Sequence, residues 1–261
     1  MPVPENQRVT IEDGIVVGDG EGRELKADLF TPPAGAANGA GVLLVHGGGW
    51  VGGDRSQLRG YGILLGRAGY TSLACEYRLA PAARWPAQIH DVKAALRWLR
   101  ANAPRLGVDP KKIAVSGNSA GGHLSLMLAA TQNAEPFEGS GGNPGVSTEV
   151  AACIAFYAPV LLGAPGAPLS DAVRALLGRD ATDERVREAS PIALASASFP
   201  PTMLITGNKD ELVPDESSVR MYTALRDAGA RAELHIYEGA PHAFDALPLY
   251  GRQAAVLMQT F

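Results

Sequence analysis

A β-branched run, a serine flanked by glycines and a leucine-rich run follow one another near the middle of the chain. Residues 112–116 (KIAVS) have the composition of a short buried strand, and residues 123–131 (HLSLMLAAT) that of a helix. Gly117-Asn118-Ser119-Ala120-Gly121 stands between them. The pattern Gly-x-Ser-x-Gly alone is weak, because 31 of the 261 residues are glycine. A strand, a tight turn and a helix in this order predict a nucleophile elbow, with Ser119 as a catalytic nucleophile.

The glycines on either side of Ser119 have a physical role in such a turn. A serine in a strained strand-to-helix turn needs neighbours without a Cβ atom, so that the strand and the helix can approach closely. Gly117 and Gly121 meet this requirement, and they support the prediction of an elbow.

Strands and helices alternate along most of the chain, which predicts βαβ units and a mostly parallel, doubly wound sheet with helices on both faces. Residues 8–17 and 24–30 alternate as strands, and the Gly/Asp-rich turn between them is short enough for an antiparallel hairpin. The length fits one α/β domain, residues 1–261. The remaining strands are expected at residues 42–45, 70–76, 150–157, 202–206 and 233–237, and the remaining helices at 57–68, 87–102, 215–228 and within 245–260.

Two segments interrupt this alternation. Residues 132–148 are rich in Gly, Glu and Pro and are expected to form a surface loop. Residues 162–197 are longer than a simple crossover needs, and helices are predicted within them at 169–177 and 183–189. An insertion at the end of the strands predicts a small lid or part of a pocket wall.

The composition is 46% hydrophobic and 19% charged, as in a globular protein. The net charge of −4 and the lack of a basic block argue against nucleic acid and anionic membranes as partners.

Cys75 and Cys153 lie in apolar runs and are expected to be reduced core thiols. Residues 1–5 show no signal-peptide pattern, and no apolar run reaches the ~20 residues of a membrane span, so we expect a cytoplasmic protein.

A serine nucleophile needs a base, and the histidine that follows the last predicted strand is the best placed. His242 lies in the segment Glu238-Gly239-Ala240-Pro241-His242, where a loop lets the imidazole reach over the sheet toward Ser119. The alternative is a surface histidine with backbone partners. The other histidines are poorer candidates, because His90 lies in a helix, His235 in a strand, His46 in a glycine motif and His123 in the helix after Ser119.

An acid that orients the histidine is expected between Ser119 and His242 in the chain. Asp210 follows the predicted strand 202–206 most closely, and a carboxylate there can hold the imidazole tautomer. An ordinary turn aspartate is the alternative. Glu211, Asp215 and Asp245 are rival acids that stand farther from the end of the strand.

The segment His46-Gly47-Gly48-Gly49-Trp50 directly follows the predicted strand 42–45. Consecutive glycines expose backbone N–H groups and leave room for a substrate carbonyl. Two such N–H groups, together with the N–H of Ala120, would form an oxyanion hole with three donors. The alternative is a flexible glycine turn. Trp50 fits a substrate pocket and a packed core equally well.

These segments resemble α/β-hydrolase serine esterases related to hormone-sensitive lipase, as does Tyr77-Arg78-Leu79-Ala80-Pro81 before a helix. Within that group the chain is most similar to compact bacterial carboxylesterases of the feruloyl and acetylxylan esterase type, which carry a segment like Ala189-Ser190-Pro191. The resemblance implies an α/β-hydrolase fold, with Ser119, Asp210 and His242 as the triad. It also implies that Gly48, Gly49 and Ala120 are the oxyanion donors. Many enzymes of the group carry a helical cap before the first strands, and here any lid must come from residues 132–148 or 162–197.

We therefore expect a serine carboxylesterase that needs no cofactor or metal and hydrolyses small-molecule esters with short acyl groups, as a monomer or homodimer. An arylformamidase with the same triad is the alternative reading. A ligand-binding receptor on a hydrolase scaffold is disfavoured, because such proteins typically lack a triad member. A metal-dependent hydrolase is disfavoured too, because no cluster of His, Asp and Glu has ligand spacing.

Overall fold

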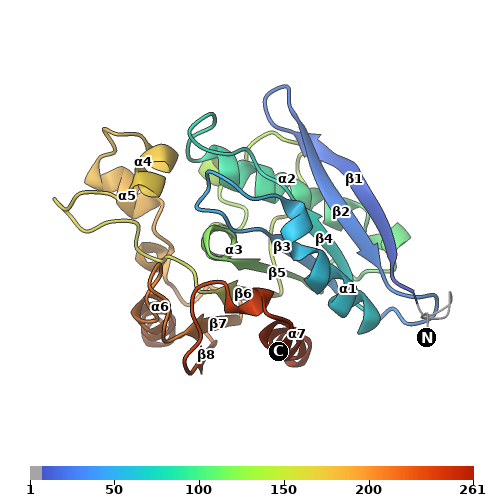
Figure 1. Cartoon of the computed structure of the whole chain (residues 1–261). Helices are drawn as coiled ribbons and strands as arrows, with labels where there is room; N and C mark the ends of the chain where they lie inside the picture. Colours follow the sequence, from blue (N-terminus) through green and yellow to red (C-terminus); the bar gives the residue numbers. More distant parts are fainter. Residues whose placement is uncertain (1–7) are drawn as a thin grey trace.

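The computed structural model describes residues 8–261, in which eight strands form one sheet with the order β1-β2-β4-β3-β5-β6-β7-β8 (Figure 1). The prediction about a signal peptide concerns residues 1–5 and lies outside the described residues. The strands are β1 (Thr10–Asp19), β2 (Glu24–Thr31), β3 (Gly41–Val45), β4 (Thr71–Cys75), β5 (Ile113–Asn118), β6 (Ala152–Phe156), β7 (Thr202–Gly207) and β8 (Ala232–Tyr237).

The predicted N-terminal hairpin is present, because β1 pairs with β2 in antiparallel register, with Thr10 opposite Thr31. Strand β2 is also antiparallel to β4, and every pair from β4 to β8 is parallel. This mostly parallel sheet with an antiparallel edge confirms the predicted α/β-hydrolase fold. The carboxyl ends of the parallel strands therefore meet at one edge, where ligands bind in open α/β sheets.

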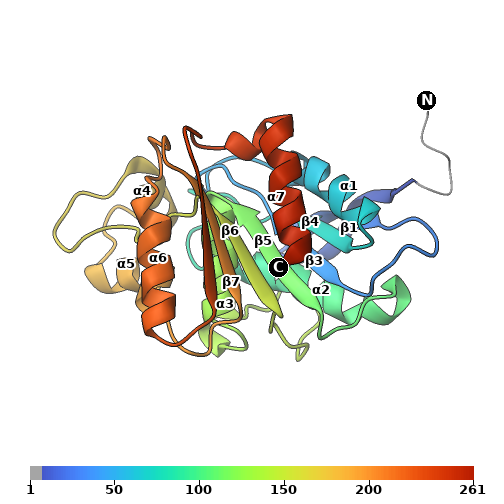
Figure 2. The same ribbon diagram turned by 90° about the horizontal axis from the view of Figure 1, so that it is seen from below.

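Two apolar layers cover the sheet, and the strands supply alternate residues to each. Leu43 and Val45 of β3 pack in one layer, whereas Val42 and Leu44 pack in the other. Helices α2, α3 and α6 contribute to the first layer, and α1 and α7 to the second (Figure 2). The helices are α1 (Arg59–Arg67), α2 (Ala87–Ala101), α3 (Ala120–Ala130), α4 (Asp171–Leu177), α5 (Asp183–Glu188), α6 (Glu216–Asp227) and α7 (Pro248–Thr260).

Most predicted elements are found within a few residues of the expected bounds. The helix expected at 57–68 begins as a 3-10 turn, Arg55–Leu58, and continues as α1. Asp54 caps this turn by accepting a hydrogen bond from the N–H of Ser56 at 2.7 Å. The C-terminal helix starts at Pro248, after a separate 3-10 turn at Phe244–Ala246, because a proline is favoured in the first turn of a helix.

The two predicted interruptions have different surroundings. Residues 132–148 lie against α2, where Lys93 and Arg97 bind the carboxylate of Glu138 at 2.7 and 3.1 Å. Residues 162–197 carry α4 and α5, which stand at the opposite end of the molecule from the β1–β2 hairpin in both views (Figures 1 and 2).

Cys75 and Cys153 are free and buried, as predicted, and burial raises the pKa of the Cys75 thiol to about 12. None of the helices formed by residues 8–261 has the length and apolar character of a membrane span.

Candidate active site

Ser119 stands at a strained turn between β5 and α3. Its φ of 53° is in the left-handed region, which costs energy for a residue with a side chain. The flanking glycines are required by close packing. A Cβ atom on Gly117 would lie 2.4 Å from the carbonyl oxygen of Gly121, and one on Gly121 would lie 2.0 Å from that of Val45. The glycines therefore allow β5 and α3 to approach closely, as the sequence predicted, and they also leave room for the end of β3.

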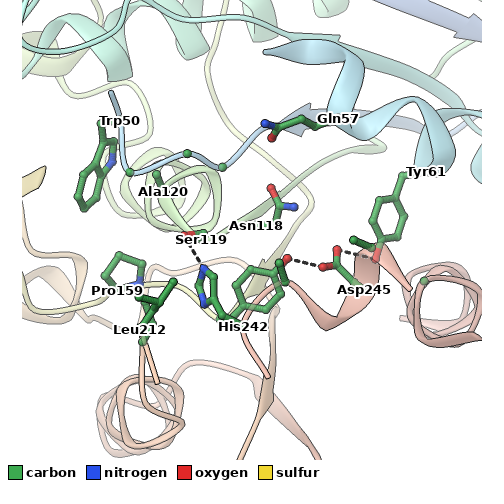
Figure 3. A pocket seen from close by; sticks show the side chains of 18 of the residues that line it. Trp50, Gln57, Tyr61, Asn118, Ser119, Ala120, Pro159, Leu212, His242 and Asp245 are labelled. Atoms are coloured by element: carbon green, nitrogen blue, oxygen red, sulfur yellow. Dashed lines mark hydrogen bonds between the residues drawn. The ribbon is translucent and has the colours of Figure 1, made fainter. Parts of the chain in front are cut away.

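His242 and Asp210 lie in line with Ser119. The Nε2 atom of His242 is 3.1 Å from Ser119 Oγ (Figure 3). Its Nδ1 atom is 2.6 Å from Asp210 Oδ2. The other oxygen of Asp210 accepts hydrogen bonds from the backbone N–H groups of Leu212 at 2.9 Å and Val213 at 2.8 Å. Because a carboxylate only accepts, Nδ1 of His242 carries the proton and Nε2 is free to accept the serine hydroxyl.

The rival acids have other surroundings. Glu211 is exposed, and Asp215 precedes α6 without a capping bond from its side chain. Asp245 is buried, and its carboxylate accepts hydrogen bonds from the hydroxyls of Tyr157 and Tyr61, the second at 3.0 Å. The structure therefore brings Asp210, rather than these residues, to the imidazole of His242.

The other four histidines have partners elsewhere. His46 is stacked on Tyr77, with 4.3 Å between ring centroids, and burial lowers its pKa. His90 lies 3.2 Å from the carbonyl oxygen of Pro136, and His235 lies 2.7 Å from Glu233. His123 is fully buried, and the loss of hydration lowers its pKa to about 4.

The glycine segment after β3 passes beside Ser119. A Cβ atom on Gly47 would lie 3.3 Å from the Cβ of Ser119. Gly48 and Gly49 have φ values of 117° and 59°, and their N–H groups donate to no acceptor within residues 8–261. Ala120 is the first residue of α3, so its N–H has no intrahelical acceptor. These three residues line the same cavity as Ser119.

Trp50 is both a core residue and part of the cavity wall. Its indole N–H donates to Nδ1 of His123 at 3.2 Å, and Nε2 of His123 in turn donates to the carbonyl oxygen of Ala189 at 2.8 Å. His123 therefore connects the glycine segment, the elbow helix and the Ala189-Ser190-Pro191 segment. Sequence reasoning placed His123 in the helix after Ser119 but did not foresee these two bonds.

A cavity of about 1310 Å³ opens beside Ser119. Its wall toward the insertion is mostly apolar and includes Leu162, Val173, Pro159 and Leu212, so residues 162–197 contribute to it as expected. The loop 132–148 contributes no residue to this wall. The part of the wall toward α1 and α7 combines the polar side chains of Gln57, Asn118 and Arg252 with the apolar side chains of Ile63 and Leu64.

Ser190 connects the start of the insertion to its second helix, α5. Ser190 Oγ donates to the carbonyl oxygen of Val186 at 2.6 Å and accepts from the N–H of Leu162 at 3.0 Å. A third hydrogen bond, from the indole N–H of Trp85 to Glu188 at 3.2 Å, connects the end of α5 to the segment before α2. These bonds fix the insertion as a wall of the cavity.

Within residues 8–261, no group of three or more His, Cys, Asp or Glu side chains is arranged to hold a metal ion.

The sequence profile of the BD-FAE family matches residues 27–225, which span most of the sheet, Ser119 and Asp210. The chain belongs to the BD-FAE family.

Curated relatives of this BD-FAE chain include Esterase LipC of Mycobacterium tuberculosis, which is 35% identical over 85% of the chain and 56% of LipC. The chain spans 56% to 64% of the length of LipC and of two further curated relatives from Mycobacterium tuberculosis, LipM and LipQ. These relatives and the family match confirm the resemblance inferred from the sequence motifs.

Solved structures give the same fold. A truncated carbohydrate esterase from gut microbiota superposes with a TM-score of 0.84 at 25% identity, over 99% of both chains. A thermophilic esterase, Est2 of the Planctomycetes species Thermogutta terrifontis, was solved with propionate bound. It superposes on the BD-FAE chain with a TM-score of 0.82 at 29% identity, over 99% of this chain and 94% of its own.

Proposed function

We propose that the chain is a serine carboxylesterase that hydrolyses short-chain acyl esters through an acyl-enzyme intermediate. The proposal rests on the contacts of His242 with Ser119 Oγ at 3.1 Å and with Asp210 Oδ2 at 2.6 Å. A hydroxyl beside the unprotonated nitrogen of an imidazole, whose other N–H is bound to a buried carboxylate, is the arrangement that activates serine.

In the first half of the reaction, Ser119 Oγ attacks the ester carbonyl while His242 Nε2 takes its proton. Asp210 remains ionised and stabilises the imidazolium through the 2.6 Å contact with Nδ1. His242 then gives the proton to the leaving alcohol. Water repeats these steps on the acyl-enzyme, releasing the carboxylic acid and restoring Ser119.

The negative charge of each tetrahedral intermediate needs donors that are already in place. We assign this role to the N–H groups of Gly48, Gly49 and Ala120, which are unpaired within the described part of the chain and line the cavity beside Ser119. The carbonyl oxygen of Gly48 accepts hydrogen bonds from the N–H groups of Val51 at 3.2 Å and Gly52 at 3.0 Å, so the segment is already held in place when the charge forms.

The preference for short acyl groups is supported by Est2, the relative solved with propionate. The cavity wall formed by Leu162, Val173 and Leu212 is apolar, as an acyl group requires. The cytoplasmic location and the monomeric or dimeric state expected from the sequence stay predictions.

The test is hydrolysis of p-nitrophenyl esters from acetate to palmitate by the wild type and by Ser119→Ala. We expect a maximum at short chains and a loss of nearly all turnover in Ser119→Ala, about 10⁶-fold as for the nucleophile of one well-studied serine protease. Ser198→Ala is the matched control, because Ser198 is exposed and outside the cavity wall.

Ester cleavage by folded Ser119→Ala near the wild-type rate would overturn the assignment of the nucleophile. A wild type that cleaves no ester but does cleave N-formylated arylamines would replace the esterase proposal with the arylformamidase alternative.

A further inference from the structure

The imidazole of His242 is held by two hydrogen bonds that leave one motion free. The ring belongs to the segment between β8 and the 3-10 turn at Phe244–Ala246. Its bonds to Asp210 and Ser119 use the two ring nitrogens, whose N–H and lone pair lie in the plane of the ring. Both bonds tolerate a tilt of the ring about the line that joins the two nitrogens. A third contact, against the ring itself, is needed to limit that tilt.

Tyr157 makes this third contact. Its ring lies against that of His242, with 4.6 Å between the centroids and 62° between the planes, which is a favourable edge-to-face arrangement. Tyr157 directly follows β6, is 1% exposed and lines the cavity beside Ser119. Its backbone has a φ of 34°, a conformation that a residue with a side chain keeps only where its surroundings fix it.

The hydroxyl of Tyr157 is fixed too, because it donates a hydrogen bond to Oδ1 of Asp245. The other oxygen of Asp245 accepts from the hydroxyl of Tyr61 in α1 at 3.0 Å. Figure 3 shows His242, Asp245 and Tyr61 in a row along the cavity. Asp245 lies three residues after His242, so Tyr157 contacts the same segment at two points.

The pKa shifts of Tyr157 and Asp245 are compatible with the hydrogen bond between their side chains. Burial raises the pKa of Tyr157 well above its usual value, so the hydroxyl keeps its proton and remains a donor. Burial also raises the pKa of Asp245, while the hydrogen bonds from Tyr157 and Tyr61 oppose this shift.

We propose that Tyr157 is the positioning residue of His242: its ring limits the tilt of the imidazole, and its hydrogen bond to Asp245 holds that ring in place. This inference rests on the proposed function, since it takes His242 as the general base. A tyrosine that only fills the core would contribute to stability without affecting the alignment of His242 with Ser119.

The test compares Tyr157→Phe, which keeps the ring but loses the bond to Asp245, with Tyr157→Leu, which also loses the ring. Tyr70→Phe is the matched control. It removes a hydroxyl that donates to the carbonyl oxygen of Gln259 at 3.1 Å, outside this cluster. The readouts are kcat and KM for p-nitrophenyl butyrate, the rate of phosphorylation of Ser119 by paraoxon, and Tm.

We expect Tyr157→Leu to lower kcat about 100-fold, because small misplacements of a reacting group cost about this much. Tyr157→Phe should lower kcat about fivefold, the equivalent of one hydrogen bond. Phosphorylation by paraoxon should slow by similar factors, and KM should change less than kcat, because Tyr157 acts on the alignment of His242. Tyr70→Phe should lower Tm by no more than Tyr157→Phe does, because its bond is part-buried and goes to a neutral carbonyl, and it should leave kcat unchanged.

The proposal is overturned if folded Tyr157→Leu keeps kcat and the paraoxon rate within twofold of the wild type. If Tyr157→Leu does not fold, the test is the comparison of Tyr157→Phe with Tyr70→Phe. Equal kcat values for these two variants would overturn the proposal. Failure of the proposed function is distinguishable, because it would appear as ester hydrolysis by Ser119→Ala, whatever the Tyr157 variants do.

Discussion

Replacing Asp210 with asparagine tests whether Ser119, His242 and Asp210 act together as a triad. The new amide has one favourable orientation, and this orientation decides which tautomer His242 adopts. The oxygen Oδ1 of Asp210 accepts two backbone N–H groups, from Leu212 at 2.9 Å and Val213 at 2.8 Å. In Asp210→Asn the amide oxygen must keep this place, because turning it would set an NH₂ group against two N–H donors. Each lost bond would cost about 1–3 kcal/mol. The NH₂ group therefore faces His242.

This orientation forces the wrong tautomer on His242. An NH₂ group can only donate, so Nδ1 must accept and the ring proton moves to Nε2. Nε2 can then no longer take the proton of Ser119. The same change in another serine hydrolase lowers kcat by about 10⁴, and we expect a loss of that size here, or about 5.4 kcal/mol of transition-state stabilisation.

The measurement is kcat for p-nitrophenyl butyrate, with Tm and circular dichroism as checks of folding. Asp215→Asn is the matched control, because Asp215 makes no capping bond with its side chain and does not line the cavity. A folded Asp210→Asn within tenfold of the wild-type kcat would refute the reasoning. A large loss in Asp215→Asn instead would identify a different acid.

Two further predictions concern the glycine segment and a buried histidine. In Gly48→Ala the new Cβ would lie 2.2 Å from the carbonyl oxygen of Gly52 at a φ of 117°, so the backbone must move. We expect kcat to fall about 10²–10³-fold, as when an oxyanion donor is lost. Gly35→Ala, which has open space at a φ of 78°, should stay fully active, and equal activities of the two variants would contradict the prediction. His123 has a pKa of about 4 in the folded chain against an ordinary 6.5, so between these values the unfolded chain binds more protons and stability is lost as the pH falls. From pH 6.5 to 4, the free energy of unfolding of the wild type should fall by about 3 kcal/mol more than that of His123→Gln in urea denaturation, and parallel pH profiles would contradict this.

The sequence predicted the sheet and the site residues where the information is local. Alternating strands and helices indicated a parallel sheet, since βαβ units return each strand to the same direction. Gly117, Ser119 and Gly121 predicted a tight turn, and the structure shows the close contacts that exclude a Cβ at both glycines. Asp210 and His242 were predicted because each follows a strand, and the carboxyl ends of parallel strands meet at one edge.

Contacts between distant segments were beyond prediction. Asp245 entered the sequence analysis only as a rival acid, and the structure places it between Tyr61 and Tyr157. The bonds of His123 to Trp50 and Ala189 were missed for the same reason. A tyrosine or aspartate in an apolar stretch gives no signal of its partner in the sequence. A polar side chain without a local partner, in a stretch predicted to be buried, could have indicated a hydrogen bond to a distant segment.

The sequence by itself determined the order of strands and helices and the positions of Ser119, Asp210 and His242 at strand ends, because turns and periodicity depend on neighbours a few residues apart. Only the tertiary structure decided which acid meets His242 and which aromatic ring lies against it. Tyr61 and Asp245 are 184 residues apart in the chain, and their 3.0 Å contact exists because α1 and the segment after β8 pack at the same end of the sheet. Such contacts depend on the relative placement of whole elements, which side-chain patterns along the chain do not encode.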